Sequence, residues 1–219
     1  MKLYPVMLNV SGKRVLVIGG GTVALRKIRD LISCGARVTV VAPEVHASVD
    51  ELASSHPENL EIIRRRYRCG DLEGALMVFS ATDDDEVNHA VFNEAKEKNI
   101  FINAVDDPGN CTFYVPSWFT RGGLVVAVST GGISPAMAAR IRRDIEGLIP
   151  DTFGETLDAL QQARTILQND AEFTGLTAEQ RGKILKQIVM DDDLLGGLVT
   201  SFKNETVKSF IKQLIAAEA

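Results

Sequence analysis

The sequence has few of the features that mark a secreted, membrane or nucleic-acid-binding protein. Its three cysteines are widely spaced and odd in number, which argues against a disulfide framework or a zinc knuckle and fits a reducing cytoplasm. No apolar run approaches the roughly 18 residues needed to cross a bilayer. Pro5 and Asn9 interrupt the short apolar stretch at the start, so we expect no secretory signal. A net charge of -5 argues against a broad electrostatic grip on nucleic acid.

The first hundred residues alternate between strand-like and helix-like patterns. Residues 14–18 read RVLVI, glycines follow, and apolar residues then recur at helical spacing until Gly35. A second β-branched run at 37–41 ends at Pro43. Further strands are predicted at 60–67, 75–80 and 101–105, with a helix before the last of them that Asp83 would cap. The alternation predicts an α/β fold with a Rossmann-type parallel sheet covered on both faces.

The pattern changes after Pro108. Two more strands are predicted at 112–115 and 124–129, and Ser134-Pro135 is typical of a helix start. From residue 151 onward only helical patterns occur, with a capping box at Thr177 and Gln180 and a last helix expected to begin at Asn204. We therefore expect a Rossmann domain at residues 1–112, a small mixed segment at 113–150 and an all-helical C-terminal domain at 151–219.

The glycine-rich turn is the clearest local signal for a ligand. Residues 19–24 read GGGTVA and match the G-x-G-x-x-G/A pattern. Gly19 would allow the tight turn, Gly21 the approach of a pyrophosphate, and Ala24 the close packing of helix on strand. Because the motif follows a strand and opens a helix inside a βαβ unit, it predicts dinucleotide binding. A glycine turn that binds nothing, or another nucleotide, is the alternative.

The second predicted strand lacks the acid that usually binds the ribose hydroxyls at this point. It ends Val41-Ala42-Pro43, and the first acid is Glu44. Either Glu44 reaches back to the ribose, or backbone groups around Pro43 hold it. No arginine stands at that strand end to bind a 2′-phosphate, which favours NAD over NADP as the cofactor.

Several segments together carry a family resemblance. They are VLVIGGGTVALRK (15–27), ARVTVVAP (36–43), SATDDDEVN (80–88), INAVDDP (102–108), FYVPS (113–117) and AVSTGGISPAMAARIRR (127–143). In this order they resemble the precorrin-2 dehydrogenase and sirohydrochlorin ferrochelatase family, the N-terminal module of siroheme synthases. The resemblance implies NAD⁺-dependent oxidation of precorrin-2 to sirohydrochlorin, followed in bifunctional members by insertion of ferrous iron to give siroheme. It also implies a homodimer, interlocked through the segment after the Rossmann domain.

The motif and the resemblance together assign site residues. Those expected to bind the cofactor are Gly19, Gly20, Gly21, Thr22, Val23, Pro43, Glu44 and Thr82. Asp106 aligns with the aspartate thought to serve as general acid or base, and it follows a predicted strand at the same sheet edge as the glycine turn. In the alternative reading, Asp106 merely forms a turn with Asp107-Pro108. Thr130 stands where some family members carry a serine.

The tetrapyrrole that the resemblance names carries many carboxylates, so a net-acidic protein must gather positive charge locally. Four arginines are candidates, with a solvated helix face as the equal alternative: Arg121, Arg140, Arg142 and Arg143. The three histidines show no ligand spacing, so no protein metal site is predicted. The arginine-rich run at 64–68 is more typical of a solvated edge strand than of a nucleic-acid patch.

Two other functions compete with this interpretation. One is a nucleotide-sensing regulatory module of the kind attached to potassium transporters, which usually places an acid at the end of the second strand. The other is an oxidoreductase that acts on a different, smaller substrate in a closed cleft.

Overall fold

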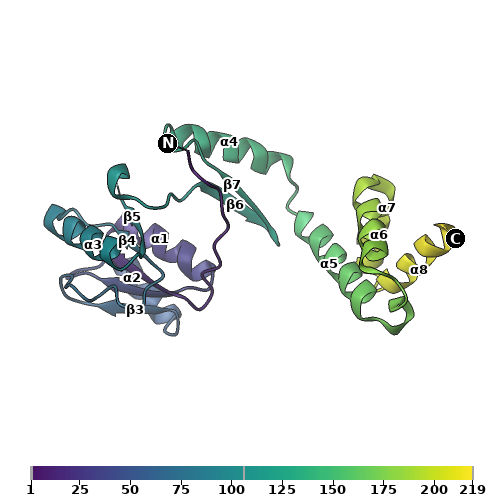
Figure 1. Ribbon diagram of the computed structural model, residues 1–219, viewed down its shortest axis with the longest axis horizontal. Coiled ribbons are helices and arrows are strands. Elements are labelled where there is room, and N and C mark those ends of the chain that lie inside the picture. The colour runs from purple at the N-terminus through teal and green to yellow at the C-terminus, as the bar shows by residue number, and fades with distance from the viewer. Residues whose placement is uncertain (1, 106, 219) are drawn as a thin grey trace. The chain divides into compact units, whose positions relative to one another are not determined.

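The chain divides between Val115 and Pro116 into two compact units in the computed structural model, which describes residues 2–105 and 107–218 (Figure 1). Strands and helices alternate along the first unit, as the sequence predicts. They are β1 (Arg14–Ile18), α1 (Thr22–Ser33), β2 (Arg37–Val41), α2 (Ala47–Ser55), β3 (Leu60–Ile63), β4 (Met77–Ser80), α3 (Asp85–Glu97), β5 (Phe101–Ala104) and the 3₁₀ turn η1 (Pro108–Asn110).

The five strands of the first unit form one parallel sheet in the order β3-β2-β1-β4-β5. Ile18 at the end of β1 lies in register with Val41 of β2 and Ser80 of β4, so these carboxyl ends meet at one edge. The chain runs outward from β1 to β2 and β3 and then returns to β4 on the other side of β1. Ligands of open parallel sheets bind where the strand order reverses in this way.

Alternate residues of β1 pack against helices on opposite faces of the sheet. Val15 and Val17 pack with buried residues of α1 and α2, whereas Leu16 and Ile18 pack with buried residues of α3. All four are at most 2% exposed. Burying an aliphatic side chain contributes roughly 1.5–3 kcal/mol, so both faces of the sheet hold the strand ends in place.

The second unit begins with an antiparallel hairpin of β6 (Ser117–Arg121) and β7 (Leu124–Val128), on which α4 (Pro135–Leu148) packs. Helices then pack around a separate apolar core that includes Ala163 and Leu198. They are α5 (Phe153–Asn169), the 3₁₀ turn η2 (Ala171–Phe173), α6 (Ala178–Met190), α7 (Asp192–Lys203) and α8 (Val207–Glu218). Within the described residues, no helix is long and apolar enough to cross a bilayer.

The structure confirms the fold class: a Rossmann-type parallel sheet, a small antiparallel sheet and a helical C-terminal region. The capping box of Thr177 and Gln180 and the cap at Ser134 are also confirmed. The finer three-part division, with its boundary near residue 150, stays a prediction.

Three local predictions are wrong. Residues 112–115 form no strand. The backbone N–H of Thr112 donates to the Ile102 carbonyl of β5, and the Thr112 hydroxyl accepts from the Ile102 N–H, so the side chain takes the place of a second backbone hydrogen bond. Asp84, not Asp83, caps α3 by accepting from the backbone N–H of Val87. Asn204 ends α7 rather than beginning α8.

Candidate functional site

The turn between β1 and α1 places three glycines at the carboxyl edge of the sheet. Gly19 has a φ of +108°, and a Cβ there would lie 2.1 Å from the carbonyl oxygen of Ala81. A Cβ on Gly20 would lie 2.6 Å from the carbonyl oxygen of Glu44. Gly21 differs, because its backbone is in an ordinary region and nothing lies within 4 Å of its Cβ position. The first two glycines let the turn pack against neighbouring strand ends, and the third leaves open space.

The amino end of α1 is built to receive an anion. Gly21 is its N-cap and offers no side-chain acceptor, and the first turn contains no acidic residue. By contrast, His46 caps α2 and Asp84 caps α3. Free N–H groups and the positive end of the helix dipole therefore face the space above Gly21. These features fit the diphosphate of a dinucleotide.

Two cavities flank this turn. The first has a volume of about 530 Å³, and Gly19 and Pro43 are among its lining residues. The second, also of about 530 Å³, is lined in part by Val23 and Val105. Thr82 borders both cavities, so a ligand with two ends could occupy both with its middle at the glycine turn.

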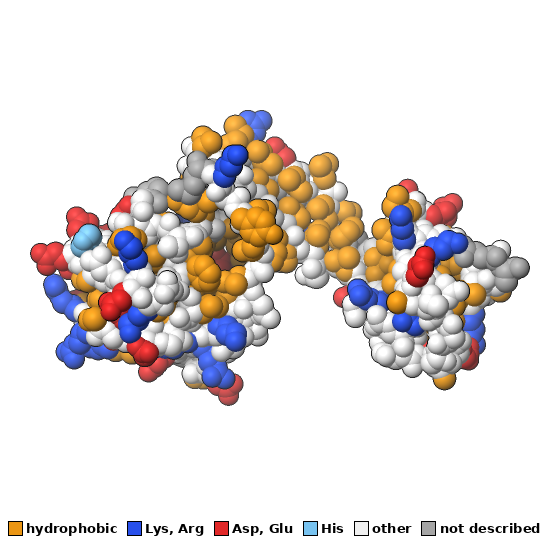
Figure 2. Space-filling model, viewed as in Figure 1, with side chains coloured by type: hydrophobic (Ala, Val, Ile, Leu, Met, Phe, Trp, Pro, Cys, Tyr) orange, Lys and Arg blue, Asp and Glu red, His pale blue; other side chains and the backbone are white. Residues whose placement is uncertain are grey.

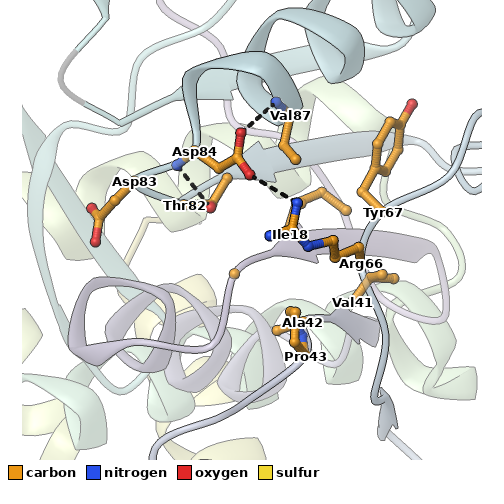
Figure 3. A pocket seen from close by; sticks show the side chains of 11 residues that line it. Ile18, Val41, Ala42, Pro43, Arg66, Tyr67, Thr82, Asp83, Asp84 and Val87 are labelled. Atoms are coloured by element: carbon orange, nitrogen blue, oxygen red, sulfur yellow. Dashed lines mark hydrogen bonds and ion pairs between the residues drawn. The ribbon is translucent and has the colours of Figure 1, made fainter.

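The first cavity contains an ion pair that the sequence analysis missed. Nη1 of Arg66 lies 3.6 Å from Oδ2 of Asp84, and both side chains line the cavity beside Pro43 (Figure 3). The segment after β2 itself contains no arginine, as expected, but Arg66 enters the same cavity from the end of the neighbouring strand β3. Arg66 comes shortly after β3, whose last residue Ile63 lies in register with Val41 of β2, so the pairing of these two strands places it at this edge.

A buried carboxylate fastens this segment to α3. Glu94 is 4% exposed, and it accepts hydrogen bonds from the Tyr67 hydroxyl and from the backbone N–H groups of Gly70 (3.0 Å) and Leu72 (3.3 Å). Burial, and then the hydrogen bond to Glu94, raise the pKa of Tyr67 well above its usual range, so the hydroxyl stays a donor. The contact holds the Arg66–Tyr67 wall of the first cavity in place.

We expect Glu94→Ala to lower the free energy of unfolding of the first unit by about 2–4 kcal/mol, because two backbone donors and one hydroxyl lose a charged acceptor. Denaturant titration of the full chain measures this. Glu97→Ala, which removes an exposed acid from the same helix, is the matched control. Equal losses in the two variants would contradict the role given to Glu94.

The structure places half of the predicted cofactor residues in the linings of the two cavities: Gly19, Val23, Pro43 and Thr82. Thr22 is exposed at the start of α1, and Val23 lines the second cavity. Pro43 lines the first cavity, whereas Glu44 is exposed and is not among its lining residues. Thr82 borders both, and its hydroxyl accepts from the backbone N–H of Asp84 (3.2 Å). Backbone groups near Pro43 are therefore better placed for a ribose than the Glu44 side chain.

Asp106, the predicted acid–base residue, lies outside the described residues. Its neighbours Val105 and Asp107 line the second cavity. Asp107 precedes η1, and its carboxylate accepts from the side-chain amide of Asn110 (2.6 Å). Burial raises the pKa of the nearby Cys111 thiol, which keeps it protonated and a poor nucleophile. Asp107, together with Asp83, Asp85 and His89, therefore supplies side chains in the lining of the second cavity that could exchange protons.

The four candidate arginines lie in the second unit. Arg121 and Arg142 both pair with Glu146, and Arg121 also pairs with Asp151 (2.9 Å). Arg140 and Arg143 are exposed on α4, where Arg140 makes only a long pair with Asp144 (3.9 Å). Arg140 and Arg143 are therefore the freer of the four to meet a carboxylate. Among the described residues, no group of three or more His, Cys, Asp and Glu side chains could hold a metal ion.

Comparison with known proteins assigns the chain to a family. Residues 6–117 match the family model described as "Putative NAD(P)-binding", and residues 121–148 match the central segment of sirohaem biosynthesis proteins. The chain belongs to the NAD(P)-binding family of sirohaem biosynthesis proteins. This membership confirms the resemblance and the prediction of an NAD-type cofactor.

Similar proteins extend the match over the whole chain. The siroheme synthase of Methylobacillus flagellatus is 36% identical over 217 residues, which cover 99% of this chain and 44% of that protein. That of Ectopseudomonas mendocina is 43% identical over 155 residues, covering 71% of this chain and 33% of that protein. The chain thus spans less than half the length of these relatives. The solved structure of SirC, a precorrin-2 dehydrogenase, is 28% identical with a TM-score of 0.77, covering 98% of this chain and all of that one.

Proposed function

We propose that the chain is an NAD⁺-dependent dehydrogenase that oxidises precorrin-2 to sirohydrochlorin. The observation that carries the proposal is the similarity to a precorrin-2 dehydrogenase along the full length of both chains. The siroheme synthase relatives support the same substrate class. A regulatory module that only senses nucleotide is not favoured, since neither the central sirohaem segment nor this full-length similarity would be expected of it.

The cofactor residues are those around the glycine turn. Bound NAD⁺ supplies the acceptor for a hydride from the macrocycle. Gly21 and the first N–H groups of α1, at Thr22 and Val23, hold its diphosphate, and the backbone near Pro43 holds a ribose. Thr82, which borders both cavities, contacts the dinucleotide between its two halves. Their placement at the reversal of strand order supports these roles.

Asp106 is the proton-transfer residue of this proposal. Loss of a hydride leaves an electron-poor macrocycle, and loss of a proton to a carboxylate completes the two-electron oxidation. The overall balance is precorrin-2 and NAD⁺ giving sirohydrochlorin, NADH and a proton. The position of Val105 and Asp107 in the wall of the second cavity supports this role for the residue between them.

Insertion of ferrous iron into sirohydrochlorin is a second candidate activity. The siroheme synthase relatives favour it, because they match nearly the whole chain. Iron is a substrate in this reaction. Since no ligand cluster occurs among the described residues, it would meet the nitrogens of the macrocycle, and a carboxylate such as Asp106 would accept the pyrrole protons.

A homodimer formed through the hairpin and α4 completes the proposal. Hydrophobic side chains gather over these elements (Figure 2). The exposed ones include Val125, Ile133, Met137, Ile141 and Leu148. An apolar surface of this kind on a single chain is typical of a protein–protein interface. A second copy of the chain would cover it.

An anaerobic assay with precorrin-2, NAD⁺ and Fe²⁺ tests the activity. We expect NADH and sirohydrochlorin to appear in equal amounts without iron. Conversion to siroheme that depends on the protein when Fe²⁺ is added would establish the second activity. A protein that binds NAD⁺ but leaves precorrin-2 unchanged would contradict the proposal and favour the sensing module.

A further inference from the structure

The ion pair of Arg66 and Asp84 crosses the first cavity. Arg66 follows β3 and Asp84 follows β4, and β2 and β1 lie between these strands in the sheet. The pair therefore reaches over the carboxyl ends of the two strands that carry Gly19 and Pro43 (Figure 3). Any group that enters from the end of β2 meets both charges.

Both ends of the pair are anchored to α3. Oδ1 of Asp84 accepts from the Val87 N–H at the helix start, which leaves Oδ2 facing Arg66. On the other side, buried Glu94 of α3 holds Tyr67, the residue after Arg66. The same helix thus holds the Asp84 carboxylate and the residue next to Arg66, whereas the Arg66 side chain itself is 79% exposed and reaches Asp84 across the cavity.

The pair lines the cavity that includes the end of β2, the strand end at which a Rossmann domain normally has its ribose-binding acid. That acid, at the end of the second strand, accepts from the ribose hydroxyls and repels a 2′-phosphate. Here β2 ends without one, and the first acid after it, Glu44, is exposed and does not line the cavity. Asp84 brings a carboxylate to the same cavity from another strand end. Asp83 also lines the cavity, but its side chain points away from Arg66 (Figure 3).

We infer that Asp84 and Arg66 together select NAD over NADP, an inference that rests on the proposed NAD⁺ site. Asp84 does this in two ways. Its charge repels a 2′-phosphate, and its contact with Arg66 occupies the guanidinium that would otherwise bind that phosphate. Without the Asp84 charge, Arg66 is left free in the cavity, and arginine is well suited to phosphate.

Asp84→Asn is the variant that isolates the charge. Asparagine caps helices as well as aspartate does, so α3 should still begin at the same residue. We expect the ratio of the dissociation constants for NADP⁺ and NAD⁺, measured by isothermal titration calorimetry on the full chain, to fall by at least about tenfold. Arg66→Gln added to Asp84→Asn should reverse the part of this fall that depends on the freed guanidinium, and leave the part that comes from the lost repulsion.

Two matched controls remove like charges from outside the cavity. Glu86→Gln changes an acid in the first turn of α3, and Arg64→Gln changes an arginine that pairs with Asp50. Neither should change the ratio. Thermal melting of each variant shows whether it is folded. Arg66→Glu adds a negative charge without changing the α3 cap, so it should weaken the binding of NADP⁺ more than the binding of NAD⁺.

The outcomes separate this inference from the proposed function. If the wild-type chain binds NAD⁺ and Asp84→Asn leaves the ratio unchanged, or Glu86→Gln shifts it equally, the selector role is overturned while the dehydrogenase proposal stands. If the folded wild-type chain binds neither nucleotide, both fall. A double variant with the same ratio as Asp84→Asn alone would also overturn the part given to Arg66.

Discussion

Gly21→Asp is expected to weaken NAD⁺ binding at least about a hundredfold without unfolding the chain. The backbone at Gly21 is in an ordinary region and its Cβ position is open, so the side chain causes no clash in the protein itself. Aspartate is also a favourable N-cap, and its carboxylate would accept hydrogen bonds from the N–H groups that otherwise bind the diphosphate. Bulk, charge and loss of donors therefore all act against the cofactor. Calorimetric titration with NAD⁺ measures the loss.

Two further variants make this result specific. Gly21→Asn has nearly the same shape without the charge, so a smaller loss is expected and the difference reports the repulsion. Gly19→Ala should instead destabilise the first unit, because its Cβ would meet the Ala81 carbonyl at 2.1 Å. Tight NAD⁺ binding by folded Gly21→Asp protein would remove the turn from the cofactor site.

Asp106→Asn is expected to lower turnover of precorrin-2 by about 10²–10⁴-fold, the usual contribution of a well-placed acid or base. NAD⁺ binding should stay within about twofold of wild type, because a neutral side chain of the same size remains in place. The assay is single-turnover formation of NADH with saturating NAD⁺ and precorrin-2, paired with calorimetric titration of NAD⁺.

The adjacent acid provides the comparison for Asp106. The Asp107 carboxylate already accepts a hydrogen bond from the Asn110 side-chain amide. Asp107 is also the residue that precedes the 3₁₀ turn η1. Asp107→Asn should therefore cost much less turnover than Asp106→Asn. Equal turnover in the Asp106 variant and the wild type, or a larger loss at Asp107, would return Asp106 to a turn-forming role.

Much of the Rossmann unit was predictable because its signals are local. The runs at 14–18 and 37–41 are β-branched and end in glycine or proline, and the glycine turn between them has the spacing that its packing requires. The Ser134 cap and the Thr177 capping box were predictable for the same reason. Local hydrogen bonding decides each of these features within a few residues.

The caps assigned to Asp83 and Asn204 were local errors, whereas the contacts that the sequence did not reveal join segments that lie apart along the chain. Thr112 was predicted to lie in a strand, but its hydroxyl and backbone N–H form hydrogen bonds with the backbone of Ile102 and no strand follows. Arg66 is exposed after an edge strand, as the arginine-rich run predicts, but its ion pair with Asp84 and the hydrogen bond of Tyr67 to Glu94 beside it were not predicted. Sequence spacing carries no information on such pairs, which are separated by 27 residues in the second case.

A crystal structure of the chain with NAD⁺ tests the central claim most directly. We predict that the diphosphate lies against the N–H groups at the start of α1, with adenosine in the cavity beside Pro43 and nicotinamide in the cavity beside Val105. Nucleotide bound elsewhere on the chain, or bound in these cavities with the nicotinamide on the Pro43 side, would contradict it.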